Sequence, residues 1–251
     1  MAKVRLDQLL VDRGLVESRS RAQALIMAGL VYSKERKLEK AGQQVAEDIA
    51  LDVRGQDHSW VSRGGLKLAH ALEHFNIDPA GMICIDVGAS TGGFTDVLLQ
   101  NGAARVYAVD VGHGQLAWKL RSDDRVIVLE KTNARYLTPE QIPEPVDMVV
   151  CDASFIGLKT VLPAAMSLTR DKAILAALIK PQFEAGREHV GKGGVVRDPE
   201  IHTTVCEDIR TWLSAQVNWS VEGIVESPIK GPEGNIEFLI IGRKSATSSL
   251  I

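Results

Sequence analysis

The stretch between residues 82 and 99 constrains the fold more than any other part of this sequence. It opens as a short apolar run that ends on the carboxylate of Asp86, turns through Gly88, Gly92 and Gly93, and resumes with apolar residues at helical spacing. Glycines at such a turn let the backbone bend tightly and present its N–H groups to a ligand. The stretch therefore predicts a strand, a ligand-binding turn and a helix, in that order.

The spacing of this turn narrows the class of ligand. Its glycines follow Gly-x-x-x-Gly-Gly, which differs from the dinucleotide-binding Gly-x-Gly-x-x-Gly and lacks the Gly-Lys-Ser/Thr of a P-loop. The carboxylate of Asp86 at the strand end would repel a phosphate and attract a cation. This favours S-adenosylmethionine, whose amino acid part carries an ammonium group beside a sulfonium. A plain tight turn is the alternative when the motif is taken alone.

Composition indicates a globular protein of a reducing compartment. The 45% hydrophobic content is ordinary for a chain that buries a core, and the net charge of −3 does not by itself indicate nucleic-acid binding. The three cysteines, Cys84, Cys151 and Cys206, lie far apart and show no disulfide or metal-binding spacing. The first residues of the sequence lack the apolar run of a leader, and the longest apolar run, residues 173–179, is too short to span a membrane. We expect a soluble cytoplasmic protein without a metal.

The first sixty residues form a separate pattern with a basic bias. Residues 1–40 hold nine lysines and arginines against five acidic residues. Helical spacing covers residues 5–13, and Ser18 is placed to cap a second helix over residues 19–27. Extended pieces at residues 30–32 and 49–53 predict a small hairpin. Two helices and a hairpin in so short a segment predict a compact unit.

This unit resembles the S4-type RNA-binding domain. The resemblance rests on Arg5-Leu-Asp-x-Leu-Leu, on Ser18-Arg-Ser-Arg-Ala and on the Ala-Gly-Leu-Val that ends at Val31. It implies a basic surface that docks on structured RNA through phosphate contacts, which give affinity more than sequence readout. A merely solvated helix face is the alternative for these side chains. The RNA-binding candidates are Lys3, Arg5, Arg19, Arg21 and Lys34.

The remainder of the chain alternates strand and helix patterns. After the first strand, further strands are predicted at residues 105–109, 126–129, 146–151, 173–179, 220–225 and 236–241, with helices near residues 66–75, 157–169 and 199–217. Apolar strands alternating with helices predict an α/β domain, a mostly parallel Rossmann-like sheet covered on both faces. We expect two domains, residues 1–59 with a linker from about residue 54, and residues 60–251. The end of the chain from residue 244 is expected to be loose.

Polar side chains follow several of these strands. Ligands of parallel sheets bind beyond the carboxyl ends of the strands. Asp110, 22 residues after Gly88, stands where a carboxylate can hold the ribose hydroxyls of a nucleoside. Asn133 follows the next strand and either meets an adenine edge or is an ordinary loop asparagine. Asp152 and Lys180 end two further strands, and a charge such as that of Lys180 is costly there unless it has partners or a task.

A second resemblance covers this half of the chain. Lys67, Asp152, Lys180 and Glu237 match, in order and context, the Lys-Asp-Lys-Glu tetrad of the FtsJ-like ribose 2′-O-methyltransferases. With the S4-like unit ahead of it, the whole chain resembles the TlyA family of ribosomal RNA cytidine 2′-O-methyltransferases, many of which carry the name haemolysin. Residues 86–94 match the S-adenosylmethionine motif. The resemblance implies S-adenosyl-L-methionine as cofactor, and the residues expected to hold it are Asp86, Gly88, Ser90, Gly92, Gly93, Phe94, Asp110 and Asn133.

The tetrad implies a division of roles. A ribose 2′-hydroxyl is a weak nucleophile, so its methylation needs positioning and the removal of one proton. Lys180 is the candidate for the group that receives that proton or, alternatively, only positions the hydroxyl. Lys67, Asp152 and Glu237 would orient it. The expected partner is ribosomal RNA or a ribosomal subunit, no membrane partner is expected, and a monomer is the default expectation.

Two functions of other classes compete with this interpretation. A membrane-active haemolysin would need a spanning helix, a leader or a strongly amphipathic cationic segment, and the sequence has none of these. A non-catalytic RNA-binding protein would retain the fold without activity, and the complete tetrad argues against it. Among methyltransferases, a base-modifying enzyme is disfavoured because Asp-Ala-Ser-Phe, residues 152–155, is not an Asn/Asp-Pro-Pro-aromatic strand end.

Overall fold

The computed structural model describes residues 3–246 except residues 14, 17, 35 and 54–58. The predicted linker at residues 54–59 therefore lies outside the described residues except for Ser59. The same holds for the last five residues, 247–251, of the predicted loose end.

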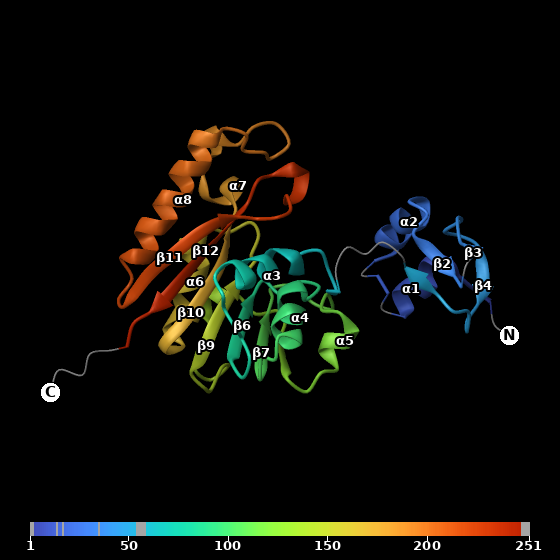
Figure 1. The fold of residues 1–251 in the computed structure, drawn as a ribbon, viewed down its shortest axis with the longest axis horizontal. Coiled ribbons are helices and arrows are strands. Elements are labelled where there is room, and N and C mark those ends of the chain that lie inside the picture. The colour runs from blue at the N-terminus through green and yellow to red at the C-terminus, as the bar shows by residue number, and fades with distance from the viewer. Residues whose placement is uncertain (1–2, 14, 17, 35, 54–58, 247–251) are drawn as a thin grey trace.

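The N-terminal unit contains two helices and two small antiparallel sheets (Figure 1). Its elements are β1 (Lys3–Arg5), α1 (Leu6–Asp12), α2 (Arg19–Met27), β2 (Val31–Ser33), β3 (Arg36–Lys37), β4 (Gln44–Ala46) and β5 (Asp52–Val53). Both predicted helices are confirmed, and Ser18 caps α2 by accepting a hydrogen bond from the Arg21 backbone N–H at 3.2 Å. The predicted pairing of the two extended pieces is confirmed by Val31 opposite Val53. Sequence reasoning missed β1 and β4, because three residues are too few to show strand alternation.

The larger part of the chain is built on a seven-stranded sheet. Its strands are β6 (Ile83–Val87), β7 (Arg105–Val109), β8 (Val126–Leu129), β9 (Val146–Cys151), β10 (Thr169–Ile179), β11 (Trp219–Glu226) and β12 (Phe238–Lys244). The helices are α3 (Gly65–His74), α4 (Gly93–Gln100), α5 (Trp118–Arg121), α6 (Leu158–Ser167), α7 (Pro181–Glu184) and α8 (Pro199–Ser214). Three short 3-10 turns, η1 (Ala134–Tyr136), η2 (Arg187–His189) and η3 (Pro232–Gly234), lie between them.

The strand order confirms a mostly parallel sheet. The order is β11-β12-β10-β9-β6-β7-β8, with β10, β9, β6, β7 and β8 parallel and with β12 and β11 antiparallel. β12 runs antiparallel to β10, so the first residues of β12 lie beside the last residues of β10. The predicted last strand began at residue 236, whereas β12 begins at Phe238 and leaves Glu237 just ahead of it. Differences of one or two residues at an element's end are expected from sequence alone.

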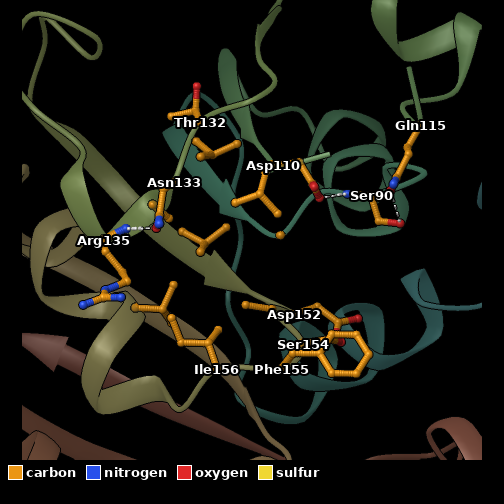
Figure 2. Close-up of a pocket in the computed structure, with 17 residues that line it drawn as sticks. Ser90, Asp110, Gln115, Thr132, Asn133, Arg135, Asp152, Ser154, Phe155 and Ile156 are labelled. Atoms are coloured by element: carbon orange, nitrogen blue, oxygen red, sulfur yellow. Dashed lines mark hydrogen bonds between the residues drawn. The ribbon is translucent and has the colours of Figure 1, made fainter. Parts of the chain in front are cut away.

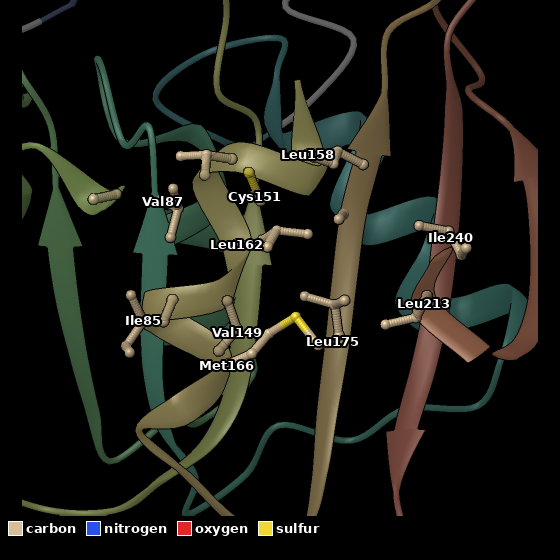
Figure 3. Close-up of a cluster of buried hydrophobic side chains, with 14 of the residues drawn as sticks. Ile85, Val87, Val149, Cys151, Leu158, Leu162, Met166, Leu175, Leu213 and Ile240 are labelled. Atoms are coloured by element: carbon tan, nitrogen blue, oxygen red, sulfur yellow. The ribbon is translucent and has the colours of Figure 1, made fainter. Parts of the chain in front are cut away.

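Helices cover both faces of the sheet, as the apolar strands predicted. Alternate residues of a strand point to opposite faces. Ile85 and Val87 of β6 pack in one buried cluster with residues of α6 and α8 (Figure 3), whereas Cys84 belongs to a second cluster with residues of α3, α4 and α5. Because both faces of the sheet are buried, polar side chains gather beyond the carboxyl ends of its parallel strands.

Candidate active site

The glycine turn after β6 is held by close backbone contacts. Gly88 has a φ of +81°, and a Cβ atom there would lie 2.8 Å from Ala153 Cα. Gly93 approaches the start of α3, where an added Cβ would lie 2.9 Å from the Gly65 backbone nitrogen. Side chains at either position would force these backbones apart. The turn therefore lies directly against the segment that carries Lys67 and the loop that carries Asp152.

Four separate elements bring the predicted tetrad together. Lys67 stands in the first turn of α3, and Asp152 and Lys180 directly follow β9 and β10. Glu237 directly precedes β12, and Phe238 pairs with Ile179 across the sheet. The antiparallel register of β10 and β12 therefore places Lys180 and Glu237 at the same edge of the sheet.

The four side chains form a line of alternating charge. Lys180 Nζ lies 2.6 Å from Asp152 Oδ1, and Lys67 Nζ lies 3.6 Å from Asp152 Oδ2. Lys67 Nζ also donates a hydrogen bond to Glu237 Oε2 at 2.8 Å. The Lys67 and Lys180 side chains are only 8% and 6% exposed, and the Glu237 side chain is fully buried. Buried charges of this kind persist only when they are paired, so each charge here depends on its neighbours.

Lys180 has three polar partners. Its amine donates to the Ser154 hydroxyl at 2.8 Å and to the Asp152 backbone carbonyl at 3.1 Å, in addition to its ion pair with the Asp152 carboxylate. Among the described residues, the paired Asp152 Oδ1 itself accepts no hydrogen bond. The amine of Lys180 is thereby fixed beside the loop that follows β9.

A cavity of about 470 Å³ lies beyond the carboxyl ends of β6 and β7 (Figure 2). Gly88, Ser90, Asp110 and Asn133, four of the residues expected to hold a cofactor, line it. Asp110 Oδ2 accepts a hydrogen bond from the Ser90 backbone N–H at 2.8 Å, and its Oδ1 accepts one from the Gly112 N–H at 2.7 Å. The carboxylate of Asp110 is thus fixed at the cavity wall.

A second cavity of about 210 Å³ lies between the glycine turn and the tetrad. Gly93 and Phe94 line it on one side, and Lys67, Asp152 and Lys180 line it on the other. Gly88, Ser90, Asp152 and Ser154 border both cavities. The tetrad therefore opens toward the same space as the predicted cofactor-binding turn.

Two of the predicted cofactor residues do not line either cavity. Asp86 is fully buried beneath the turn, where its Oδ2 accepts hydrogen bonds from the Thr95 backbone N–H at 2.9 Å and from the Thr95 hydroxyl at 2.7 Å. Its Oδ1 is buried without a hydrogen-bond partner among the described residues. Gly92 turns the chain at a φ of +99°, and a Cβ there would meet Leu120. Both residues shape the turn in this structure, and their contact with a cofactor stays a prediction.

The environment of Asp86 makes the stability of the protein depend on pH. Burial raises the pKa of Asp86 to about 7, and the nearby charge of Asp152 adds to this. A carboxyl whose pKa is raised on folding contributes stability below its unfolded pKa of about 4 and loses it as the pH rises to the folded value. We expect Asp86→Asn to raise the thermal midpoint at about pH 8 but to change it little at about pH 4. An asparagine oxygen can still accept from Thr95, so an equal shift at both values would contradict this account.

Asn133 and three residues that sequence reasoning did not select complete the site. The Asn133 side chain accepts a hydrogen bond from the Arg135 backbone N–H at 3.1 Å and so caps η1 (Figure 2). Gln182 donates to Glu237 Oε1 at 3.2 Å. Phe155 is 90% exposed at a φ of +64°, and its ring centroid lies 5.1 Å from that of Phe183. Each of the three missed residues lies within three positions of Asp152 or Lys180 in the sequence, and this closeness is the signal that could have indicated them as site residues.

The structure separates the five RNA-binding candidates into two groups. Arg5 and Arg19 both bind the carboxylate of Asp7, at 2.9 Å and 3.1 Å. The others, Lys3, Arg21 and Lys34, are exposed residues of β1, of α2 and of the turn after β2. Their contact with RNA stays a prediction.

The described residues contain neither a metal-binding cluster nor a membrane-spanning helix. Within residues 3–246, apart from the gaps given above, no three His, Cys, Asp or Glu side chains gather where they would hold a metal ion. In the same part of the chain, no helix combines the length and the apolar character needed to cross a membrane. Cys84, Cys151 and Cys206 are free thiols, and burial raises the pKa of Cys206 to about 11.

Comparison with known proteins assigns both parts of the chain. The FtsJ-like methyltransferase model matches residues 60–244, and the S4 domain model matches residues 4–48. The 16S/23S rRNA (cytidine-2'-O)-methyltransferase TlyA of Mycobacterium tuberculosis is 49% identical over 239 residues, which are 95% of this chain and 89% of that protein. Hemolysin A of Brachyspira hyodysenteriae is 39% identical over 94% of this chain and 98% of its own length.

Solved structures agree with this assignment. A protein from Streptococcus thermophilus, 46% identical, superposes with a TM-score of 0.76 over 98% of this chain and 90% of its own. The family match spans the tetrad and the glycine turn, and the identity extends over nearly the full length of both chains. The chain therefore belongs to the FtsJ-like methyltransferase family and, with its N-terminal S4 domain, to the TlyA family within it.

Proposed function

We propose that this protein is an S-adenosylmethionine-dependent ribosomal RNA 2′-O-methyltransferase that acts on cytidine ribose, in the cytoplasm and with ribosomal subunits as partner. The observation that carries the proposal is the tetrad. Four ionisable side chains from four elements meet in one buried line beside a cavity of nucleoside size. The substrate class follows the name of the Mycobacterium tuberculosis relative, which is 49% identical.

The cavity residues fit S-adenosylmethionine. The volume of the larger cavity, about 470 Å³, lies within the usual range for small-molecule sites. The two oxygens of Asp110 suit the two hydroxyls of a ribose, and the Asn133 amide nitrogen suits an acceptor on the adenine edge. When bound there, S-adenosylmethionine would supply a methyl group that its positively charged sulfur activates for transfer.

The residues of the tetrad would prepare the ribose hydroxyl. Lys180 and Asp152 both border the cavity that reaches the glycine turn, so a hydroxyl in this cavity can exchange hydrogen bonds with both groups. Lys67 lies 3.6 Å from the second oxygen of Asp152, and Glu237 in turn holds the amine of Lys67. We assign to Lys180 the orientation of the hydroxyl, whose oxygen would bond to the methyl carbon as the bond from that carbon to sulfur breaks, and whose proton would then pass to water.

The exposed ring of Phe155 marks the side from which the target nucleoside would enter. This residue lies three positions after Asp152, lines the larger cavity and combines near-complete exposure with a strained backbone. Strain of this kind gathers at functional sites, and exposed aromatic rings are the usual stacking surface for an unpaired base. The sugar of a base stacked there would lie near the tetrad.

Asp110→Ala is expected to weaken cofactor binding. Charged hydrogen bonds to ribose hydroxyls would be lost, so the dissociation constant for S-adenosylmethionine should rise about tenfold or more. Titration calorimetry measures this directly, with Asp78→Ala as a control at an exposed carboxylate far along the chain. Equal affinity of the Asp110 variant and the unchanged protein would remove Asp110 from the cofactor site.

The reaction itself is tested with labelled cofactor. Purified protein would be incubated with methyl-labelled S-adenosylmethionine and with small or large ribosomal subunits from a strain that lacks the gene. The RNA would then be digested with alkali, because a 2′-O-methyl group blocks cleavage of the adjacent phosphodiester. We expect the label in alkali-resistant dinucleotides that contain cytidine. Label in mononucleotides would mean base methylation, and its absence from both subunits would point to a non-catalytic RNA-binding protein.

A further inference from the structure

The N-terminal unit contains a fully buried carboxylate within its basic surface. Asp7, the second residue of α1, has a side chain that is 0% exposed. Its Oδ1 accepts hydrogen bonds from Arg5 Nε and from the Gln8 backbone N–H, each at 3.0 Å. Its Oδ2 accepts from Arg5 Nη2 at 2.9 Å, from Arg19 Nη2 at 3.1 Å and from Gln23 Nε2 at 3.0 Å. One carboxylate thus ties together the end of β1, the start of α1 and the first turns of α2.

Both arginines remain half exposed although they are anchored. The Arg5 and Arg19 side chains keep 46% and 50% of their surface. A guanidinium has five N–H donors, of which Arg5 uses two on Asp7 and Arg19 uses one. The Arg5 guanidinium also lies over Gly42, where an added Cβ would be 3.3 Å from Arg5 Nη1. Two guanidiniums are therefore held close together with most of their donors directed away from Asp7.

This arrangement suits a phosphodiester better than any other ligand class. Two positive charges against one negative charge leave the cluster cationic, and planar guanidiniums with free N–H pairs match phosphate oxygens in bidentate geometry. The arginines of a free surface must lose their rotamer freedom when they bind, whereas Arg5 and Arg19 have already lost it. The hydrogen bonds of Arg5 also hold the pKa of Asp7 well below its usual range, so the anchor stays charged.

We propose that Asp7 is a positioning residue that holds Arg5 and Arg19 as a rigid two-guanidinium clamp for the phosphate backbone of structured RNA. The inference rests on the proposed function, since it takes ribosomal RNA as the ligand. It carries a counterintuitive consequence. A negative charge on an RNA-binding surface should weaken binding by simple electrostatics, whereas here its removal should weaken binding.

The test compares two substitutions that remove the same charge from the same helix. Asp7→Asn keeps the shape of the side chain but turns one acceptor into a donor that faces a guanidinium. Asp12→Asn is the matched control, because Asp12 is exposed and, among the described residues, accepts a single side-chain hydrogen bond, from Gln8 Nε2 at 2.7 Å. Binding of the full-length protein to ribosomal subunits from the gene-deletion strain would be measured over a series of salt concentrations.

We expect Asp7→Asn to raise the dissociation constant about tenfold or more, and Asp12→Asn to leave it unchanged or slightly lower. Asp12→Asn should keep the methylation rate and the subunit KM of the unchanged protein, whereas Asp7→Asn should raise the KM for the subunits along with the dissociation constant. If Asp7→Asn binds as tightly as Asp12→Asn, the clamp is refuted. If the unchanged protein binds neither subunit and methylates neither, the proposed function fails, and the clamp fails with it.

A second variant separates positioning from folding. Arg19→Lys keeps the charge and removes only the planar fork, so a purely electrostatic surface predicts no change and the clamp predicts weaker binding. The double variant Asp7→Asn with Arg19→Lys should lose less than the sum of the two single losses, because both act on one unit. Additive losses, or a loss that merely follows the unfolded fraction measured by circular dichroism, would identify Asp7 as a structural residue alone.

Discussion

Lys180→Met is expected to abolish methyl transfer and to leave the affinity for S-adenosylmethionine nearly unchanged. Methionine fills the same buried space but removes the amine beside Asp152 and Ser154. Groups that move or hold a proton at a reacting oxygen contribute about 100-fold to 10,000-fold to a rate, so turnover should fall by at least the lower figure. Asp152 keeps Lys67 as a partner and is partly exposed, so the fold should tolerate the change.

The measurement pairs single-turnover methylation with calorimetric titration of the cofactor. Lys159→Met is the matched control, since Lys159 is an exposed lysine of α6 whose ion pair with Asp208 lies at the surface. Surface pairs of this kind contribute little to stability, and the control should retain full activity. A Lys180 variant that has lost cofactor binding would show that Lys180 supports the cofactor pocket, and full activity in that variant would remove it from the reaction.

Glu237→Leu is expected to destabilise the protein by about 3–5 kcal/mol. Glu237 is fully buried and lies 2.8 Å from Lys67, whose amine would keep only Asp152, at 3.6 Å, as an ionic partner. A buried charge that loses its partner is costly, whereas an apolar pair in place of both charges is often neutral. The double variant Lys67→Met with Glu237→Leu should therefore recover most of the lost stability.

Activity is expected to respond differently from stability. Methylation should be lost in Glu237→Leu, because Glu237 no longer fixes the Lys67 amine beside the second oxygen of Asp152, and it should stay lost in the double variant, which lacks that amine. Urea unfolding gives the free energy of unfolding, and labelled cofactor gives the rate under conditions where each variant is folded. Recovery of both properties in the double variant would mean that the pair serves only the fold. Recovery of stability alone would mean that the pair is retained for the reaction.

Local sequence patterns specify which elements form and which residues stand at their ends. The glycine turn at residues 86–94, the apolar strands and the alternation with helices are local patterns, and local patterns set backbone conformation and the buried face. Because parallel strands end at one edge of a sheet, Asp110, Asp152 and Lys180 could be predicted to share that edge. Glu237 and Lys67 came from the order and context of a family motif and not from periodicity.

Which of these side chains touch depends on how distant segments pack in the folded protein. Lys67 and Glu237 are 170 positions apart, and their contact depends on the antiparallel register of β12 and on the packing of α3 against the glycine turn. The same holds for Asp86, which the sequence places at the turn and the fold buries beneath it, and for Asp7, which collects two arginines from separate elements. The burial of a side chain and the identity of its partners depend on packing between distant segments, so they cannot be predicted from periodicity along one segment.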